Sequence, residues 1–166
     1  MLIPLHKELE HVEAYLSLEQ ARFPGKYMVE TDIDASLMDV LVPPFTLQPL
    51  VENAIRHSFS KGFAKPQGVV SICTQVNGKD VIITTKDNGK GIAPESMAVL
   101  GNETVPSAEG TGTALCNIAK RIGELYGSRG SVFIDSTFGQ GTSVTITLPI
   151  HYSDRGDIYV ESIYRG

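Results

Sequence analysis

Hydrophobic residues recur along this chain with two different periods, and the changes of period divide it into elements. Three- and four-residue spacing predicts an amphipathic helix over 5–23, which Pro24 and Gly25 end. The same spacing predicts helices over 47–59 and 113–126. The proline at the third position of the second helix is tolerable only if that position lies in the first turn.

Alternating apolar and polar residues predict strands between these helices, over 26–33, 69–76, 80–86, 132–135 and 143–148. Asn77-Gly78 joins the second and third of these strands and indicates a type I′ hairpin turn. The stretch STFGQGT indicates the turn before the last strand. We therefore expect an α/β fold in which helices stack on one face of a mixed sheet.

Two segments depart from these periods. Residues 87–112 hold five glycines and two prolines, which predicts a functional loop rather than an ordinary connection. Residues 151–166 have no clear period, so we expect a C-terminal tail. The expected organisation is a helix within 1–25, a central domain over 26–150 and this tail.

Composition narrows the class of protein. The chain has 166 residues, 42% hydrophobic and 20% charged, as is typical of one globular domain with a hydrophobic core. A net charge of −5 argues against nucleic acid as a partner. No apolar run reaches the length of a membrane span, and the first residues lack the order of a signal peptide. Cys73 and Cys116 lie in apolar segments, which suits a reducing compartment, so we expect a cytoplasmic domain.

The helix over 47–59 gathers polar residues on one edge. Asn53 and His57 are four residues apart, as are Glu52 and Arg56, so the four side chains form two adjacent stripes. One interpretation is a solvated surface with a Glu52–Arg56 pair that contributes a few tenths of a kcal/mol. The other is a site for hydrated Mg²⁺, which prefers oxygen ligands such as a carboxylate and an amide. The helix alone does not decide between them.

The stretch KDNGKGI places Asp87 at the end of a strand, before Gly89 and Gly91. An ordinary solvated turn has this composition too. However, the segment leads into the long glycine-rich loop, where glycines let the backbone approach a ligand and the next helix offers its N-terminus to an anion. The spacing is neither that of a P-loop nor that of a Rossmann fingerprint.

Together these residues resemble the GHKL ATP-binding superfamily. Glu52-Asn53 with His57 resembles its N box, Asp87 with the two glycines after it resembles its G1 box, and Gly110-x-Gly112 resembles its G2 box, in the same order. More narrowly, residues 3–149 are similar to the catalytic part of LytS-like sensor histidine kinases. The resemblance implies a two-layer α/β sandwich of the Bergerat type, with a mixed, mostly antiparallel sheet, and it implies that 1–25 is the remnant of a dimerisation or linker region.

The resemblance also implies ATP and Mg²⁺ as cofactors. Asn53 would coordinate the Mg²⁺ that bridges the ATP phosphates, Glu52 beside it would act as activating base or metal-side acceptor, and His57 would complete the catalytic set.

At the other end of the site, Asp87 would accept a hydrogen bond from the adenine amino group. Thr142 would support it, Leu115 would contact the nucleotide, and Gly89 and Gly91 would let the backbone pass the purine. A buried carboxylate selects adenine over guanine, because guanine presents a carbonyl at that position and two acceptors would face each other.

The G2 box implies that residues 94–109 form a lid over ATP and that Gly110 and Gly112 bring backbone amides to the phosphates. Ala114 stands where the family often has a third glycine, and we expect binding to survive this change because a helix accepts alanine readily.

The implied activity is transfer of the ATP γ-phosphoryl group to a histidine on an upstream segment that we expect to be absent from this chain. His6 and His11 are outside the family's histidine motif, and we expect both to be solvated; the chain alone would therefore bind nucleotide but label itself poorly. The implied partners are that histidine segment, a response regulator and a second copy in a membrane-anchored full-length kinase.

Three alternatives stay open from the sequence. A GHKL ATPase of the gyrase or MutL type would use Glu52 to activate water, and a nucleotide-sensing interaction module would bind without chemistry. The apolar stripe of the first helix is either part of the core or the exposed remnant of a dimerisation helix.

Overall fold

The computed structural model describes residues 1–60, 63, 65–95 and 111–153 of the chain. Its centre is a five-stranded sheet with the order β2-β4-β5-β7-β6. The strands are β2 (Tyr27–Asp32), β4 (Gly68–Asn77), β5 (Asp80–Asp87), β6 (Ser131–Thr137) and β7 (Gly141–Pro149). β2 runs parallel to β4 and the other neighbours are antiparallel, so the expected mixed, mostly antiparallel sheet is confirmed.

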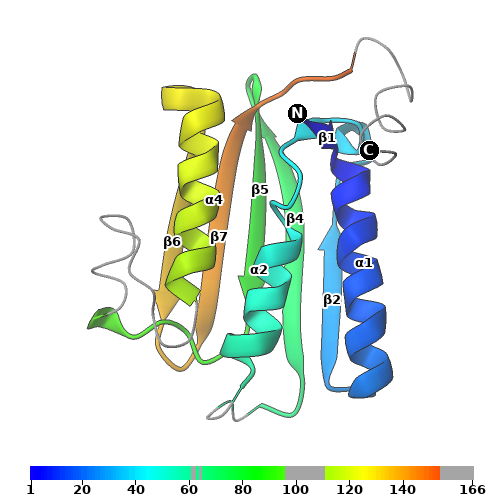
Figure 1. Ribbon diagram of the computed structural model, residues 1–166, viewed down its shortest axis with the longest axis vertical. Coiled ribbons are helices and arrows are strands. Elements are labelled where there is room, and N and C mark those ends of the chain that lie inside the picture. Colours follow the sequence, from blue (N-terminus) through cyan, green and yellow to red (C-terminus); the bar gives the residue numbers. More distant parts are fainter. Residues whose placement is uncertain (61–62, 64, 96–110, 154–166) are drawn as a thin grey trace.

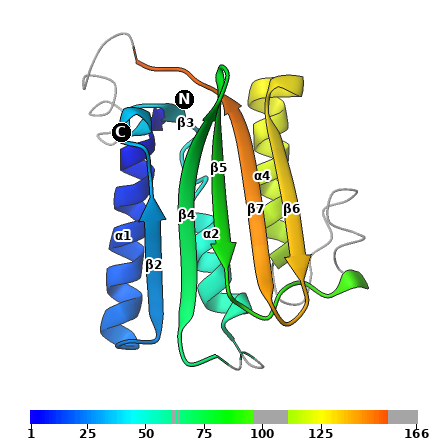
Figure 2. The same ribbon diagram turned by 180° about the vertical axis from the view of Figure 1, so that it is seen from behind.

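Three helices cover one face of this sheet: α1 (Leu5–Arg22), α2 (Gln48–Asn53) and α4 (Thr111–Tyr126). Seen from behind, the sheet lies in front of all three (Figure 2). α2 packs against both α1 and α4, and it continues into a π-helical turn, η2 (Ala54–Ser58). There are also two short 3₁₀ turns, η1 (Ala35–Leu37) and η3 (Gly127–Arg129). The predicted two-layer arrangement is therefore confirmed (Figure 1).

The core lies between the helical layer and the sheet. Its completely buried members include Leu5, Val51, Val81, Ile146 and Leu148. Each such side chain contributes about 1.5–3 kcal/mol through the removal of apolar surface from water. The apolar stripe of α1 belongs to this core, because its side chains pack against the other buried residues rather than facing solvent.

The hairpin β4–β5 is confirmed, but the predicted turn type is wrong. Asn77 is still paired with Asp80, so the two loop residues are Gly78 and Lys79. Gly78 has φ 62° whereas Lys79 does not have a positive φ, which fits a type II′ turn with glycine at its first central position. Asparagine thus ends the strand, and glycine alone supplies the left-handed backbone.

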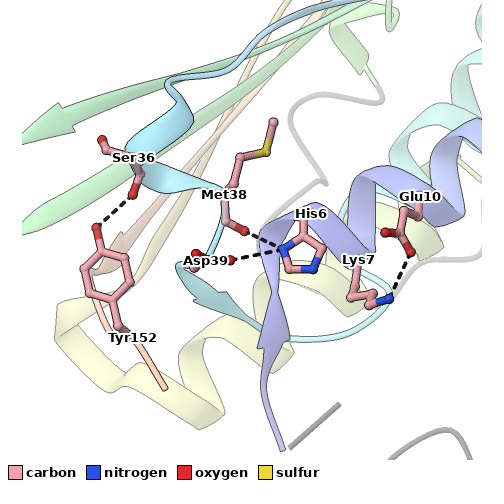
Figure 3. A network of polar contacts seen from close by, with 7 residues as sticks. All are labelled: His6, Lys7, Glu10, Ser36, Met38, Asp39 and Tyr152. Carbon is pink, nitrogen blue, oxygen red and sulfur yellow. Dashed lines mark hydrogen bonds and ion pairs between the residues drawn. The ribbon is translucent and has the colours of Figure 1, made fainter. Parts of the chain in front are cut away.

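The first and last described segments meet at one end of the sheet. β1 (Ile3–Pro4) pairs antiparallel with β3 (Leu41–Val42), and Leu41 donates its amide to the carbonyl of His151 at 2.8 Å. Figure 3 shows the Tyr152 hydroxyl donating to the Ser36 carbonyl at 3.1 Å. The described part of the expected tail is therefore held against the residues that follow η1.

The two histidines of α1 are not simply solvated, contrary to the expectation. The Nδ1 atom of His6 lies 3.1 Å from the Met38 carbonyl and 3.3 Å from Asp39 Oδ1 (Figure 3). The ring of His11 stacks on Phe45, with 6.3 Å between centroids. Both histidines contact the segment that connects β2 to α2.

Candidate functional site

A cleft with an empty volume of about 360 Å³ opens between the helical layer and the sheet. Of the predicted site residues, Asn53, Asp87, Leu115 and Thr142 line it. The remaining lining residues are Leu50, Ala54, Ser58, Val70, Thr85, Lys86, Ile92 and Val144.

The π-helical turn decides which side chains of the second predicted helix reach the cleft. The amide of Phe59 donates to the carbonyl of Ala54, five residues back, at 2.9 Å. A turn of this width places residues five apart on one side, so Asn53 and Ser58 line the cleft whereas His57 does not. The predicted Pro49 lies in the first turn of α2, as a helix requires.

Asp87 is the acidic residue that lines this cleft. Its Oδ1 atom accepts the amides of Gly89 at 2.9 Å and Thr142 at 3.3 Å. Its Oδ2 atom has only a long contact, 3.5 Å, from the Ser58 hydroxyl. Burial raises the pKa of the Asp87 carboxyl above its ordinary value, while the two amides, the Ser58 hydroxyl and Lys65 act in the opposite direction. One oxygen is therefore fixed by the backbone and the other retains capacity to accept a hydrogen bond.

Strand register builds the neighbourhood of Asp87. Asp87 is opposite Thr142 across β5 and β7, and Thr142 is opposite Ser136 across β7 and β6. The hydroxyl groups of Ser136 and Thr142 are 2.9 Å apart. Ser136 also accepts the amide of Ile92 at 2.8 Å, which fixes the segment after β5 to the β6–β7 turn. Three strands thus present one polar row at this end of the sheet.

Glycines are required where the backbone passes this row. A Cβ atom on Gly89 would lie 2.4 Å from the Cβ atom of Ser58. Gly91 has φ +75° and a Cβ there would lie 2.4 Å from the Thr137 carbonyl oxygen. Gly141 has φ +138° and a Cβ there would lie 2.0 Å from the carbonyl oxygen of Asp87. These positions leave no room for a side chain.

Other predicted residues lie outside the lining of the cleft. The Glu52 carboxylate accepts a hydrogen bond from the side-chain amide of Gln48 at 2.8 Å, in place of the alternative pairing with Arg56. Gly110 and residues 96–109 of the predicted lid fall outside the described residues. Gly112 lies in the first turn of α4, so the expected helix begins two residues earlier than 113.

Two informative residues were not among the predicted site residues: Ser58, which lines the cleft, and Gly141, which lies against the backbone of Asp87. Ser58 comes directly after the polar residues of the second predicted helix. It reaches the cleft because of the π-helical turn, which a period of 3.6 residues per turn does not predict. Gly141 belongs to the glycine-rich turn STFGQGT, but its proximity to Asp87 depends on strand register.

The cleft combines a hydrogen-bond acceptor with apolar side chains. The Oδ2 atom of Asp87 can accept from an amino group, and apolar side chains such as Leu50, Leu115 and Val144 surround the space beside it. Among the described residues, no three His, Cys, Asp or Glu side chains gather as a metal site. A magnesium ion here would therefore depend on Asn53, water and the phosphates themselves.

Comparison with known proteins agrees with this geometry. Residues 45–152 match the family described as histidine kinase-, DNA gyrase B-, and HSP90-like ATPase. The chain is 44% identical to the sensor protein LytS of Bacillus subtilis (strain 168) over 98% of its own length and 27% of that relative. It is 48% identical to the sensor protein LytS of Bacillus cereus over 90% of its own length and 25% of that relative.

The solved structure of the histidine kinase AdeS from Acinetobacter baumannii has the same fold. The TM-score is 0.61 at 20% identity, over 91% of this chain and 67% of that one. The chain belongs to the histidine kinase-, DNA gyrase B-, and HSP90-like ATPase family. The predicted family and the predicted fold are confirmed.

The chain spans about a quarter of the length of the curated relatives described above. Within the described ranges, none of the helices combines the length and hydrophobicity needed to cross a membrane. In the described part of the chain, Cys73 and Cys116 do not form a disulfide.

Proposed function

We propose that this chain is the ATP-binding catalytic part of a sensor histidine kinase, with Mg·ATP in the cleft. The observation that carries the proposal is the partly buried Asp87 carboxylate, whose Oδ1 atom is held by two backbone amides while its Oδ2 atom retains acceptor capacity. The family and the similarity to LytS sensor proteins support it.

At the adenine end, Asp87 accepts from the exocyclic amino group, and Thr142 supports the carboxylate through its backbone amide. Gly89 and Gly91 keep the passage beside the purine free of side chains, and Leu115 packs against the nucleotide from α4. The specificity follows from charge and shape, since a base that presents a carbonyl to Asp87 leaves two acceptors unpaired.

At the phosphate end, Asn53 is the proposed ligand of Mg²⁺, which neutralises phosphate charge when it is bound. Glu52 directly precedes Asn53 in sequence and His57 follows it by four residues, and both are proposed as polar neighbours of that ligand. Gly110 and Gly112 are the proposed donors of backbone amides to the phosphates. Phosphoryl transfer needs mainly positioning and charge neutralisation, which these residues supply.

In the proposed reaction a histidine nitrogen of an upstream segment attacks the γ-phosphorus, a phosphorus–nitrogen bond forms, and the bond to the bridging oxygen of ADP breaks. The segment that carries the histidine, a response regulator that receives the phosphoryl group, and a second copy of the kinase are the proposed partners. We assign the domain to the cytoplasmic side of a membrane-anchored protein, with 1–25 as the connection to the upstream region, 26–150 as the ATP-binding domain and 151–166 as its tail.

Calorimetric titration with a non-hydrolysable ATP analogue tests the proposal. We expect binding that Asp87→Asn abolishes and that Mg²⁺ strengthens only when Asn53 is present. Asp80→Asn is the matched control, because Asp80 lies on the same strand at the opposite, hairpin end. The proposal is wrong if the folded chain does not bind the analogue, or if Asp80→Asn and Asp87→Asn have the same effect.

A second assay tests the chemistry. With Mg·ATP labelled at the γ-phosphate, we expect slow labelling of the chain alone and transfer to histidine when the upstream segment is added. Rapid stoichiometric labelling of His6 or His11 would contradict the proposal. Steady phosphate release that Glu52→Ala abolishes would support a water-activating ATPase instead.

A further inference from the structure

Glu8 is a charged side chain within the hydrophobic core, far in sequence from every residue assigned to the cleft. It lies on the first turns of α1 and its solvent-exposed fraction is 0%. Its Oε1 atom accepts the amide of Thr46 at 3.2 Å, and its Oε2 atom has no hydrogen-bond partner among the described residues. A buried carboxylate with a single such hydrogen bond costs stability, so its presence requires another explanation.

The carboxylate faces the loop that begins the helix of Asn53. Burial raises the pKa of the Glu8 carboxyl, while the amides of Thr46, Leu47 and Phe45 and the nearby His11 act in the opposite direction. α2 has no side-chain cap of its own, since its N-cap residue is Leu47. Glu8 therefore supports, from another helix, Thr46, the residue that precedes this N-cap.

The same loop is held from the opposite side by α4. Phe45 has φ 59°, a strained left-handed conformation for an aromatic residue, and its carbonyl accepts from Arg121 of α4 at 2.6 Å. The Thr46 hydroxyl donates to the Pro43 carbonyl at 2.7 Å. Strain of this kind persists only where surrounding contacts fix it, and here the contacts come from α1 and α4 together.

A short chain of hydrogen bonds connects this loop to the cleft. After Thr46, the carbonyl of Leu47 accepts the amides of Leu50 at 3.0 Å and Val51 at 3.2 Å. Leu50 lines the cleft, and Asn53 follows on the next turn of the same helix and lines it too. A shift at the start of α2 therefore moves the side chain assigned to Mg²⁺, whereas Asp87 and Thr142 belong to the sheet.

We propose that Glu8 is a positioning residue of the nucleotide site: by holding the amide of Thr46, it fixes the start of α2 and thereby the position of Asn53. This inference rests on the proposed role of Asn53. In this inference, α1 helps to position the metal and phosphate end of the cleft, whereas the adenine end does not depend on α1.

A double-mutant cycle tests the proposal, with calorimetry of the whole chain and two probes, an Mg²⁺-loaded non-hydrolysable ATP analogue and adenosine. We expect Glu8→Ala to weaken binding of the Mg²⁺-loaded analogue about tenfold and to change the affinity for adenosine by less than about twofold. Glu8→Gln keeps an acceptor without the charge and is expected to weaken the analogue about threefold. Glu13→Ala, an exposed position on the same helix, is the control and is expected to change neither.

The combined variant decides whether Glu8 acts through Asn53. If it does, Glu8→Ala in an Asn53→Ala background causes no further loss. Losses that multiply, an unchanged affinity in a folded Glu8 variant, or an equal loss for adenosine would each overturn the inference. Where Glu8→Ala does not fold, the same comparison made with Glu8→Gln decides.

The two proposals fail in different ways. If Asn53→Ala alone leaves the Mg²⁺-dependent affinity unchanged, the assignment of Asn53 fails, and with it the inference. If Asn53→Ala acts as expected and Glu8→Ala adds its own independent loss, only the positioning role of Glu8 is refuted.

Discussion

The two ends of the cleft are built in different ways. At the adenine end, Asp87, Thr142 and Ser136 are held by the register of three adjacent antiparallel strands. At the other end, Asn53 lies at the junction of a six-residue helix and a π-helical turn, and the start of that helix is supported by Glu8 and Arg121 from two other elements. A sheet fixes its side chains through many backbone hydrogen bonds, whereas a short helix depends on what supports its ends.

Because the two ends of the cleft are supported differently, we expect them to contribute to nucleotide binding in different ways. In the proposed function, the sheet provides a fixed recognition site for the base, while the position of the proposed metal ligand depends on neighbouring helices. Changes within the strands are therefore expected to affect all nucleotides, and changes in the helical layer mainly the phosphate-dependent part of binding.

The largest effect is expected for Gly141→Ala, which places a methyl group 2.0 Å from the Asp87 carbonyl oxygen. We expect a loss of about 3 kcal/mol or more in the free energy of unfolding, measured by urea denaturation, and loss of nucleotide binding. Gly139→Ala is the matched control, since Gly139 has φ +86° in the same turn but no atom within 4 Å of an added Cβ. Its expected cost is about 1 kcal/mol, from backbone strain alone. Equal losses for the two variants would contradict the role of the close contact.

Asp87→Asn is expected to reduce nucleotide affinity at least about 100-fold without reducing stability at neutral pH. Burial raises the pKa of the folded Asp87 carboxyl above 3.8, so the folded state binds this proton more tightly than the unfolded state. Ionisation of Asp87 therefore costs stability as the pH rises through the raised pKa, and asparagine avoids this cost.

Melting temperatures measured across pH check this prediction. The variant is expected to match or exceed the original chain at pH 7, and its advantage is expected to disappear as the pH falls toward 3.8, the ordinary value for Asp87. A melting temperature that is lower at every pH would show that the carboxylate stabilises the fold rather than serving the ligand.

Ser136→Ala removes the hydroxyl that accepts the Ile92 amide and contacts Thr142. We expect a loss of about 1–2 kcal/mol in unfolding free energy, because the Ile92 amide loses its acceptor. Ser131→Ala, at an exposed position on the same strand, is expected to have little effect. If the two variants melt alike, the hydroxyl does not fix the segment after β5.

The smallest effect is expected for Ser58→Ala. Its contact with Asp87 Oδ2 is long, 3.5 Å, so we expect only about a twofold loss of adenosine affinity. Calorimetry with adenosine measures this directly. A tenfold loss would mean that the hydroxyl moves closer to the carboxylate when the base is bound.

Much of the fold could be predicted from local sequence patterns. The strand ends were correct to within a few residues, and the hairpin β4–β5 followed from alternation around a glycine-containing turn. The turn type was wrong, because composition does not show whether asparagine ends the strand or enters the turn. Asn53, Asp87, Leu115 and Thr142 were placed in one site by resemblance to a family, and the structure brings all four to one cleft.

The rest depends on contacts that separate segments of the chain make. Ser58 lines the cleft in place of His57 because the hydrogen bonds of the helix change there from a spacing of four residues to one of five. The hydrophobic period does not reveal this change. Gly141 matters because β7 pairs with β5 in one particular register. Glu8 looks like an ordinary polar residue of an amphipathic helix, and only packing against the loop before α2 shows that it is buried.

The central claim is that the Asp87 carboxylate reads the amino group of adenine. The most direct measurement is a calorimetric comparison of adenosine with guanosine, and of their triphosphate analogues, on the unaltered chain. The account predicts that both adenine ligands bind and that both guanine ligands are at least about 100-fold weaker. Equal affinity for the two bases would contradict it, because a carboxylate that accepts from the amino group cannot tolerate a carbonyl oxygen in the same place.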